Sequence, residues 1–135
     1  MNIVVVTARM NSARLLGKAL IDLGGQPNLI RLIERLRNCE RVDHIVVAIP
    51  EDDSILRAFC VDNVIPFSMG AKDNVLLRVL RAAQAFTADI APTERVNVMR
   101  LTTDCPFISW ELVDGAFNLF NYYPLPDTAR LWGSG

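Results

Sequence analysis

Four short apolar segments recur along this chain, and each is followed by a segment of helical periodicity. Strands are expected at residues 2–6, 44–49, 64–67 and 96–101, and they are apolar along most of their length instead of alternating with polar residues. Such strands, when they alternate with helices, are typical of parallel βαβ units whose sheet is covered by helices on both faces. The pattern therefore predicts an α/β fold of three layers, with a mostly parallel sheet and right-handed crossovers.

The segments after these strands carry apolar residues at helical spacing, so each is expected to bury one face. Helices are expected over residues 28–38 with Asn28 as cap, after residues 52–54, from a cap at Asp73 to about Phe86, and after Ser109. Their expected inward residues include Ile55, Leu56, Leu76, Val79, Leu80, Leu112 and Val113. On the first helix, arginines are interleaved with glutamates, which predicts ion pairs along its exposed face.

Length and charge limit the class of protein. A chain of 135 residues with 51% apolar residues predicts one domain with a substantial core. Residues 1–120 form the expected domain, and residues 121–135, which lack periodicity, are expected to be an extended or flexible tail. A net charge of −1 excludes a general basic surface for nucleic acid. No apolar run approaches the length of a membrane span, so no membrane partner is expected.

The cysteines are few and widely separated. Cys39, Cys60 and Cys105 form no paired motif, and His44 is the single histidine, so a zinc site is not expected. An odd number of unpaired cysteines indicates reduced thiols. The sequence therefore predicts a cytoplasmic protein.

The loop that follows the first expected strand concentrates positive charge. It carries Arg9, Arg14 and Lys18, together with Ser12 and Gly17. Parallel α/β sheets bind ligands at the carboxyl ends of their strands, and cations with the N–H groups of a tight loop can hold a polyphosphate. The loop is therefore predicted to bind phosphate groups. The alternative is a solvated basic loop, because arginines and lysines are mostly exposed.

The last expected strand leads to Asp104, a carboxylate that would face the basic loop. Mg²⁺ prefers one or two protein carboxylates, with phosphate oxygens and water completing its coordination shell. Asp104 is therefore a candidate magnesium ligand. The alternative is a turn or cap residue before the last helix, since Pro106 follows closely.

Two stretches of the chain resemble cytidylyltransferases that act on sugars. Ala8-Arg9-Met10, Ser12, Arg14-Leu15 and Gly17-Lys18 form the first, and Arg100-Leu101-Thr102, Asp104-Cys105-Pro106 and Ile108 form the second. A weaker resemblance between them rests on Gly70, Asp73, Val75-Leu76 and Arg78. The chain is most similar to the spore-coat polysaccharide biosynthesis type, whose relatives are the acylneuraminate and 3-deoxy-manno-octulosonate cytidylyltransferases. The resemblance covers about residues 1–120.

The resemblance implies a nucleotide-diphospho-sugar transferase fold and transfer of CMP from CTP to a sugar or sugar acid, with Mg²⁺ as cofactor and release of pyrophosphate. By position, Arg9 and Lys18 would be catalytic; the nucleotide-binding residues would be Ala8, Arg9, Met10, Ser12, Arg14, Lys18 and Arg78; and Asp104 would hold the metal.

The chain also departs from the family. Asn11 stands where glycine is usual, Leu16 where proline is usual, and Thr7 where glutamine is usual. The sheet is expected to be truncated after the nucleotide-binding half, without the acceptor-binding half. A homodimer is expected, because an open sheet exposes an apolar contact surface. Two alternatives to an active enzyme stay open: an inactive nucleotide-binding or protein-interaction domain that retains the fold, and a fragment without present function.

Overall fold

In the computed structural model, residues 1–11 and 16–122 are described. They form a sheet of four parallel strands in the order β3-β2-β1-β4. The strands are β1 (Asn2–Thr7), β2 (His44–Pro50), β3 (Phe67–Gly70) and β4 (Asn97–Thr102). The predicted three-layer α/β fold with a parallel sheet is confirmed. The positions predicted for Ser12 and Arg14, and for most of the tail, lie outside the described residues.

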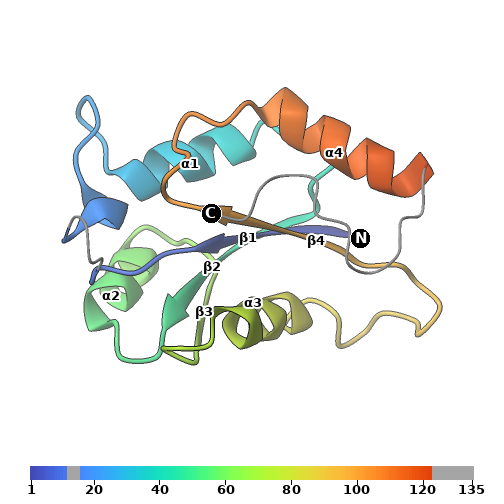
Figure 1. The fold of residues 1–135 in the computed structure, drawn as a ribbon, viewed down its shortest axis with the longest axis horizontal. Helices are drawn as coiled ribbons and strands as arrows, with labels where there is room; N and C mark the ends of the chain where they lie inside the picture. Colours follow the sequence, from blue (N-terminus) through green and yellow to red (C-terminus); the bar gives the residue numbers. More distant parts are fainter. Residues whose placement is uncertain (12–15, 123–135) are drawn as a thin grey trace.

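Helices cover both faces of the sheet (Figure 1). They are α1 (Asn28–Leu36), α2 (Ser54–Asp62), α3 (Val75–Gln84) and α4 (Trp110–Tyr122), with a short 3₁₀ helix, η1 (Lys18–Leu20), before α1. In the view of Figure 1, α1 and α4 lie above the sheet and α3 lies below it. No helix among the described residues is long and apolar enough to cross a membrane.

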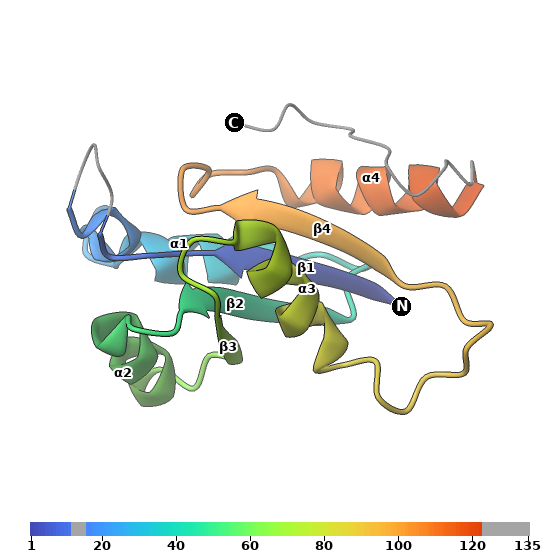
Figure 2. The same cartoon turned by 60° about the horizontal axis from the view of Figure 1, so that its bottom comes forward.

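The side chains of β1 alternate between two cores because successive residues of a strand point to opposite faces. Val4 and Val6 pack in a core with residues of α1, α2 and α4. Ile3 and Val5 pack in a second core with residues of α3. All four of these β1 side chains are completely buried, so β1 contributes to both cores. Figure 2, turned by 60°, shows α3 in front of the strands.

The third strand lies three residues later than predicted. Residues 64–66 instead lie in the connection between the end of α2 and the start of β3. Val64 has a positive φ of 55°, and the N–H of Ile65 donates to the carbonyl of Cys60. Pro66 has no N–H to donate, and its carbonyl accepts from Val47 before β3 begins. Residues 68–70, which follow the predicted strand, are therefore part of β3.

The predicted helix faces are partly wrong. Leu56, Val79 and Val113 are buried as expected, but four expected inward residues are exposed: Ile55, Leu76, Leu80 and Leu112. Two predicted caps are displaced by one residue. The cap position of α1 is Pro27 and not Asn28, and the side chain that caps α3 is that of Asn74 and not of Asp73. On α3, for example, the buried face consists of Arg78, Val79, Ala82 and Ala83, and the larger residues Leu76 and Leu80 lie outside it.

The ion pairs predicted along α1 are absent from the described residues, where the pairs are Lys18–Asp104 and Lys72–Asp52. Arg31 donates instead to the carbonyls of Leu23 and Gly24. Arg35 donates to the carbonyl of Ile108, and its guanidinium lies 5.4 Å from the ring centre of Trp110. The backbone holds these carbonyls in fixed positions, so they are good acceptors. An ion pair exposed to water, in contrast, adds little to the free energy of folding.

Candidate functional site

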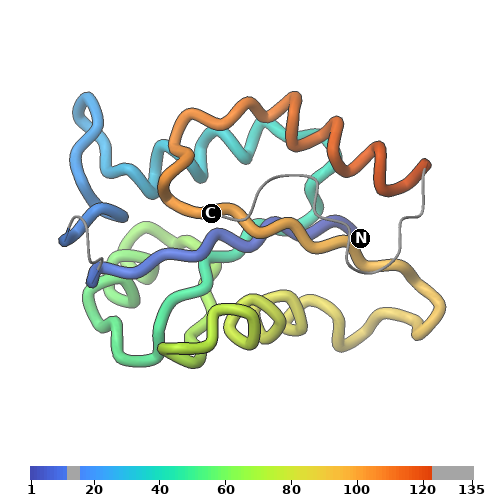
Figure 3. Tube along the Cα trace, viewed as in Figure 1, coloured from blue at the N-terminus to red at the C-terminus, as the bar shows by residue number. Residues whose placement is uncertain are grey.

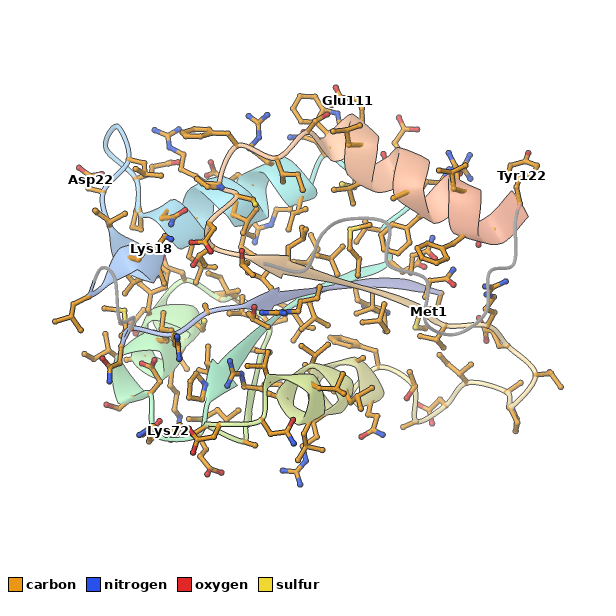
Figure 4. All side chains as sticks on the ribbon, viewed as in Figure 1. Met1, Lys18, Asp22, Lys72, Glu111 and Tyr122 are labelled. Carbon is orange, nitrogen blue, oxygen red and sulfur yellow. The ribbon has the colours of Figure 1, made fainter. Side chains whose placement is uncertain are left out.

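The carboxyl ends of the parallel strands meet at one edge of the sheet. In Figure 3 this edge is on the left, where the chain leaves β1, and the N-terminus lies at the opposite end. The ladder continues one residue past β1, because the N–H of Ala8 donates to the carbonyl of Ala48 over 3.2 Å. Figure 4 places the labelled Lys18 and Lys72 at this end, above and below the sheet.

Lys18 and Asp104, two residues singled out from the sequence, form an ion pair in the structure. Their side chains are 35% and 59% exposed, so the pair is open to solvent. Asn28 holds the two segments together: its side-chain amide donates to the carbonyl of Lys18 over 3.0 Å and to that of Thr103 over 2.9 Å. Asn28 is thus a positioning residue inside α1, and not the cap that the sequence predicted.

The basic loop is closed at its base by backbone contacts. The N–H of Gly17 donates to the carbonyl of Met10 over 2.9 Å, and Gly17 has a φ of 72°, which glycine adopts without strain. The N–H of Met10 donates to the carboxylate of Asp53 over 2.8 Å. Asp53 also caps α2 by accepting from the N–H of Leu56. This second role of Asp53 was not predicted, because nothing in a sequence distinguishes a cap from a bridging carboxylate.

A hollow of about 260 Å³ lies beside this loop. Its lining residues come from the loop, the end of β2, the start of α2 and the segment after β3: Arg9, Met10, Asn11, Pro50, Asp52, Asp53, Ser54, Ile55, Lys72 and Asp73. Lys72 pairs with Asp52 across its rim at 3.1 Å. Two of the predicted nucleotide-binding residues, Arg9 and Met10, therefore line the hollow, while Lys18 and Asp104 lie outside its lining.

Arg78 is the only arginine among the described residues that is buried, at 3% exposure. One of its terminal nitrogens donates to the carbonyls of Ala71 and Lys72 over 2.9 and 3.2 Å, and its buried Nε has no partner. Burial lowers the pKa of Arg78, and the positive charges of Arg9 and Arg100 lower it further. No described carboxylate forms an ion pair with this buried charge.

Arg100 was not among the predicted site residues. It lies on β4, exposed, and its Nε donates to the hydroxyl of Thr7 over 3.4 Å. One signal in the sequence could have identified it, namely a charged residue inside an otherwise apolar strand. Asp114, on α4, accepts from the backbone N–H groups of Glu40 and Arg41 over 2.9 Å each.

The surroundings of Asp104 fit a magnesium ion that arrives with a phosphate ligand. Among residues 1–11 and 16–122, no group of three or more metal-ligating side chains gathers at one point. A site that holds a metal by protein ligands alone is therefore missing from this part of the chain. Mg²⁺ bound by one or two carboxylates and by substrate phosphates needs no such group. Asp104 is exposed, and its carboxylate can supply the one protein ligand that such an ion needs once it is released from Lys18.

A family model for cytidylyltransferases matches residues 3–124. The chain is 33% identical over 116 residues to the spore coat polysaccharide biosynthesis protein SpsF of Bacillus subtilis (strain 168), covering 82% of this chain and 45% of that protein. It is 30% identical over 131 residues to the 3-deoxy-manno-octulosonate cytidylyltransferase of Chlorobium phaeobacteroides (strain DSM 266 / SMG 266 / 2430), covering 96% and 49% respectively.

The fold is similar to that of a CMP:2-keto-3-deoxy-manno-octonic acid synthetase solved with CTP, with a TM-score of 0.75 and 25% identity. The match covers 91% of this chain and 48% of that one. The chain thus spans about half the length of the relatives that it matches. The family match over nearly all its described length, together with the fold, shows that this chain belongs to the cytidylyltransferase family.

Proposed function

We propose that this chain binds CTP with Mg²⁺ at the carboxyl edge of its sheet, and that this site serves the transfer of CMP to a sugar or sugar acid with release of pyrophosphate. One observation carries the proposal: Lys18 and Asp104, far apart in sequence, form an ion pair beside the basic loop. The names of the relatives support CTP as the nucleotide and a sugar acid as one possible acceptor. The cytoplasmic location and the homodimer stay predictions.

The proposed roles follow from charge. Nucleotidyl transfer depends on positioning and on neutralising charge, and little on covalent help from the protein. Arg9 and Lys18 would bind the triphosphate and neutralise the negative charge that develops on the leaving pyrophosphate. Ser12 and Arg14 are proposed to join them, and Ala8 and Met10 to lie against the nucleotide. Asp104 would hold Mg²⁺, which supplies further positive charge at the phosphate oxygens when bound.

Binding would require the ion pair to exchange partners. In the structure the ammonium group of Lys18 contacts the carboxylate of Asp104. If Asp104 becomes a metal ligand, Lys18 loses that partner, and a phosphate oxygen of the nucleotide can replace it. Both side chains are partly exposed, so the exchange costs little desolvation. The same two residues would thus hold each other in the free protein and hold CTP-Mg in the complex.

Titration calorimetry of CTP, with and without Mg²⁺, tests the proposal, and ATP, GTP and UTP serve as base controls. We expect Mg²⁺-dependent CTP binding that is weakened by roughly tenfold or more in Lys18→Ala, because a charge-assisted contact is lost. Asp104→Asn should remove the dependence on Mg²⁺. Arg95→Ala is the matched control, since Arg95 is exposed and its carbonyl accepts from the N-terminus at the opposite edge of the sheet, so binding should stay unchanged.

Absence of binding for every nucleotide would contradict the proposal. Equal binding to the wild type and to Lys18→Ala would also contradict it, because the nucleotide would then occupy another surface. Release of pyrophosphate in the presence of CTP and 3-deoxy-manno-octulosonate would extend the proposal from binding to catalysis.

A further inference from the structure

We infer that α1 sets the position of the Asp104 carboxylate, and that Arg35 is the positioning residue at the far end of the segment that carries it. Asp104 is the proposed ligand of the Mg²⁺ that accompanies CTP, so this inference rests on the proposed function and adds a residue to it. Arg35 belongs to neither the basic loop nor the lining of the hollow beside it, and the predicted site did not include it.

Asp104 lies in a segment that belongs to no helix or strand. Residues 103–109 connect the end of β4 to the start of α4. Two turns order this segment: the N–H of Cys105 donates to the carbonyl of Thr102 over 3.3 Å, and the N–H of Ile108 donates to the carbonyl of Cys105 over 3.2 Å. The Asp104 side chain is 59% exposed, so packing around it does not fix its carboxylate. Its position therefore depends on what holds the segment on either side.

Both ends of the segment are held from the same face of α1. The side-chain amide of Asn28 donates to the carbonyl of Thr103 over 2.9 Å, just before Asp104. The Nε of Arg35 donates to the carbonyl of Ile108 over 2.9 Å, just before the segment enters α4. Asn28 and Arg35 are separated by two helical turns, which is about 10 Å along the axis. Their side chains therefore point to one side of α1 and hold the segment at two places.

The guanidinium of Arg35 is itself held in one orientation. It lies 5.4 Å from the ring centre of Trp110, the first residue of α4, in a cation–π contact. The ring fixes the plane of the guanidinium, and the hydrogen bond to Ile108 fixes its direction within that plane. An ammonium group has no plane to align, so lysine is not equivalent to arginine at this position.

Contacts further along the chain continue the same alignment. The thiol of Cys39 donates to the carbonyl of Trp110 over 3.7 Å. The Asp114 carboxylate accepts from the backbone N–H groups of Glu40 and Arg41. The contacting residues follow one another in the same order along both segments, and in Figure 1 α1 and α4 lie on the same face of the sheet. The helix α1 and the turn after it therefore support the whole connection from β4 into α4.

The expected consequence concerns the metal more than the phosphates. A single protein carboxylate binds Mg²⁺ well when it is already in place, because ordering a mobile group on binding costs free energy. Loss of the Arg35 guanidinium would release the second support of the segment and leave Asp104 less well placed. Arg35 has no described hydrogen bond or ion pair with the basic loop, so binding of the nucleotide without metal should not weaken.

The test compares CTP affinity in Mg²⁺ and in EDTA by titration calorimetry, and the ratio of the two affinities gives the gain due to the metal. The variants are Arg35→Met, which removes the guanidinium and keeps an unbranched chain, and Arg35→Lys, which keeps the charge. Arg31→Met is the matched control. Arg31 lies one turn earlier on α1 and also donates to backbone carbonyls, but these belong to Leu23 and Gly24, before the helix. Thermal unfolding compares the stability of the variants.

We expect Arg35→Met to reduce the gain from Mg²⁺ about tenfold, as is typical when a group that orients a metal ligand is lost, and to leave the affinity in EDTA unchanged. Arg35→Lys should reduce the gain less, because its ammonium can still donate to the carbonyl of Ile108. Arg31→Met should keep the full gain even if its unfolding temperature falls as far as that of Arg35→Met. A merely structural role would lower the stability of both variants and the gain of neither.

An unchanged gain in Arg35→Met would overturn the inference, and so would an equal loss in Arg31→Met. If Arg35→Met does not fold, Arg35→Lys is compared with the control in its place.

NMR of the ligand-free protein separates this inference from the proposed function. Arg35→Met should shift the backbone amide signals of Asp104 and Cys105, and Arg31→Met should not. If the wild type binds no nucleotide but these shifts occur, the proposed function fails and the positioning of Asp104 by α1 stands. Unshifted signals in Arg35→Met would refute the positioning role whether or not CTP binds.

Discussion

At the scale of single residues, a few side chains connect segments that are distant in sequence. Asn28 connects η1 to the residue after β4, Asp53 connects the basic loop to α2, and Asp114 connects α4 to the turn after α1. The sequence predicted for Asn28 only the local role of a helix cap. A cap or a solvent-facing carboxylate is the common role of these residues, and the rarer bridging role depends on which segments the fold brings together.

Asn28→Ala should destabilise the protein and weaken CTP binding together. The side chain is 3% exposed and donates to two backbone carbonyls, which would lose their partner, at a cost of about 1–3 kcal/mol. Thermal unfolding measures the first effect and calorimetry the second. Asn38→Ala is the matched control, since Asn38 is exposed and donates to a single carbonyl. A stable Asn28→Ala protein with normal CTP binding would refute this role.

The thiols give a pH-dependent prediction. Burial raises the pKa of Cys39 to about 11, with the negative charges of Asp114 and Glu111 adding to the effect. Burial and Asp53 likewise raise the pKa of Cys60 to about 11. Because the folded-state pKa values lie above the ordinary 9.0, the unfolded chain releases its protons first, and folding stability should fall as the pH rises from 9.0 toward 11.

Chemical denaturation at several pH values checks this fall. A Cys39→Ser/Cys60→Ser variant should flatten the dependence in that range, and Cys105→Ser should not, because Cys105 is exposed. Near neutral pH, iodoacetamide should modify Cys105 first, since Cys60 is buried, Cys39 is partly buried, and both of these thiols have a raised pKa. Mass spectrometry of the alkylated peptides would disprove this order if Cys39 or Cys60 reacted first.

At the scale of elements, the alternation of strands and helices was predictable from sequence because apolar runs and helical periodicity are local signals. The third strand was misplaced because the run at residues 64–66 is equally apolar, and only the partner β2 decides which residues pair. The prediction of which α3 residues are buried was also partly wrong. The helix places Arg78 inward, where an apolar residue would be expected from composition alone.

Alanine substitutions at two glycines, one in β3 and one in α4, are expected to change stability in opposite directions. A Cβ at Gly70, the last residue of β3, would lie 3.1 Å from Cγ and 3.3 Å from Cα of Arg78, whereas a Cβ at Gly115 in α4 would meet nothing within 4 Å. Gly70→Ala should therefore displace Arg78 and destabilise the fold by about 1–3 kcal/mol. Gly115→Ala should stabilise it by roughly 0.5–1 kcal/mol, the cost of glycine in a helix. Thermal unfolding measures both, and a stabilised Gly70→Ala would contradict the close packing of Arg78.

At the scale of the whole molecule, the described sheet exposes the outer edge of β4, which pairs only with β1. Exposed apolar side chains lie on β4 and on the segment that follows: Val98, Phe107, Leu112 and Leu119. An exposed strand edge with apolar neighbours favours association with another chain. The protein is therefore expected to form dimers or larger assemblies as its concentration rises.

Analytical ultracentrifugation over a concentration series measures this association. Val98→Lys should weaken it, because a charged residue on an edge strand opposes pairing. Arg57→Lys, which preserves the charge on α2, should leave it unchanged. A monomer at every concentration in the wild type would refute the prediction.

The Lys18–Asp104 pair has a consequence for how ligand affinity responds to ionic strength. In the free protein, each of these charges already has a counterion, supplied by the chain itself. Binding CTP-Mg exchanges this internal pair for new pairs with the metal and the phosphates, so fewer salt ions are released or taken up than the charge of a triphosphate alone implies. The affinity of the wild type should then vary less steeply with salt than that of Asp104→Asn, in which Lys18 meets the nucleotide without an internal competitor.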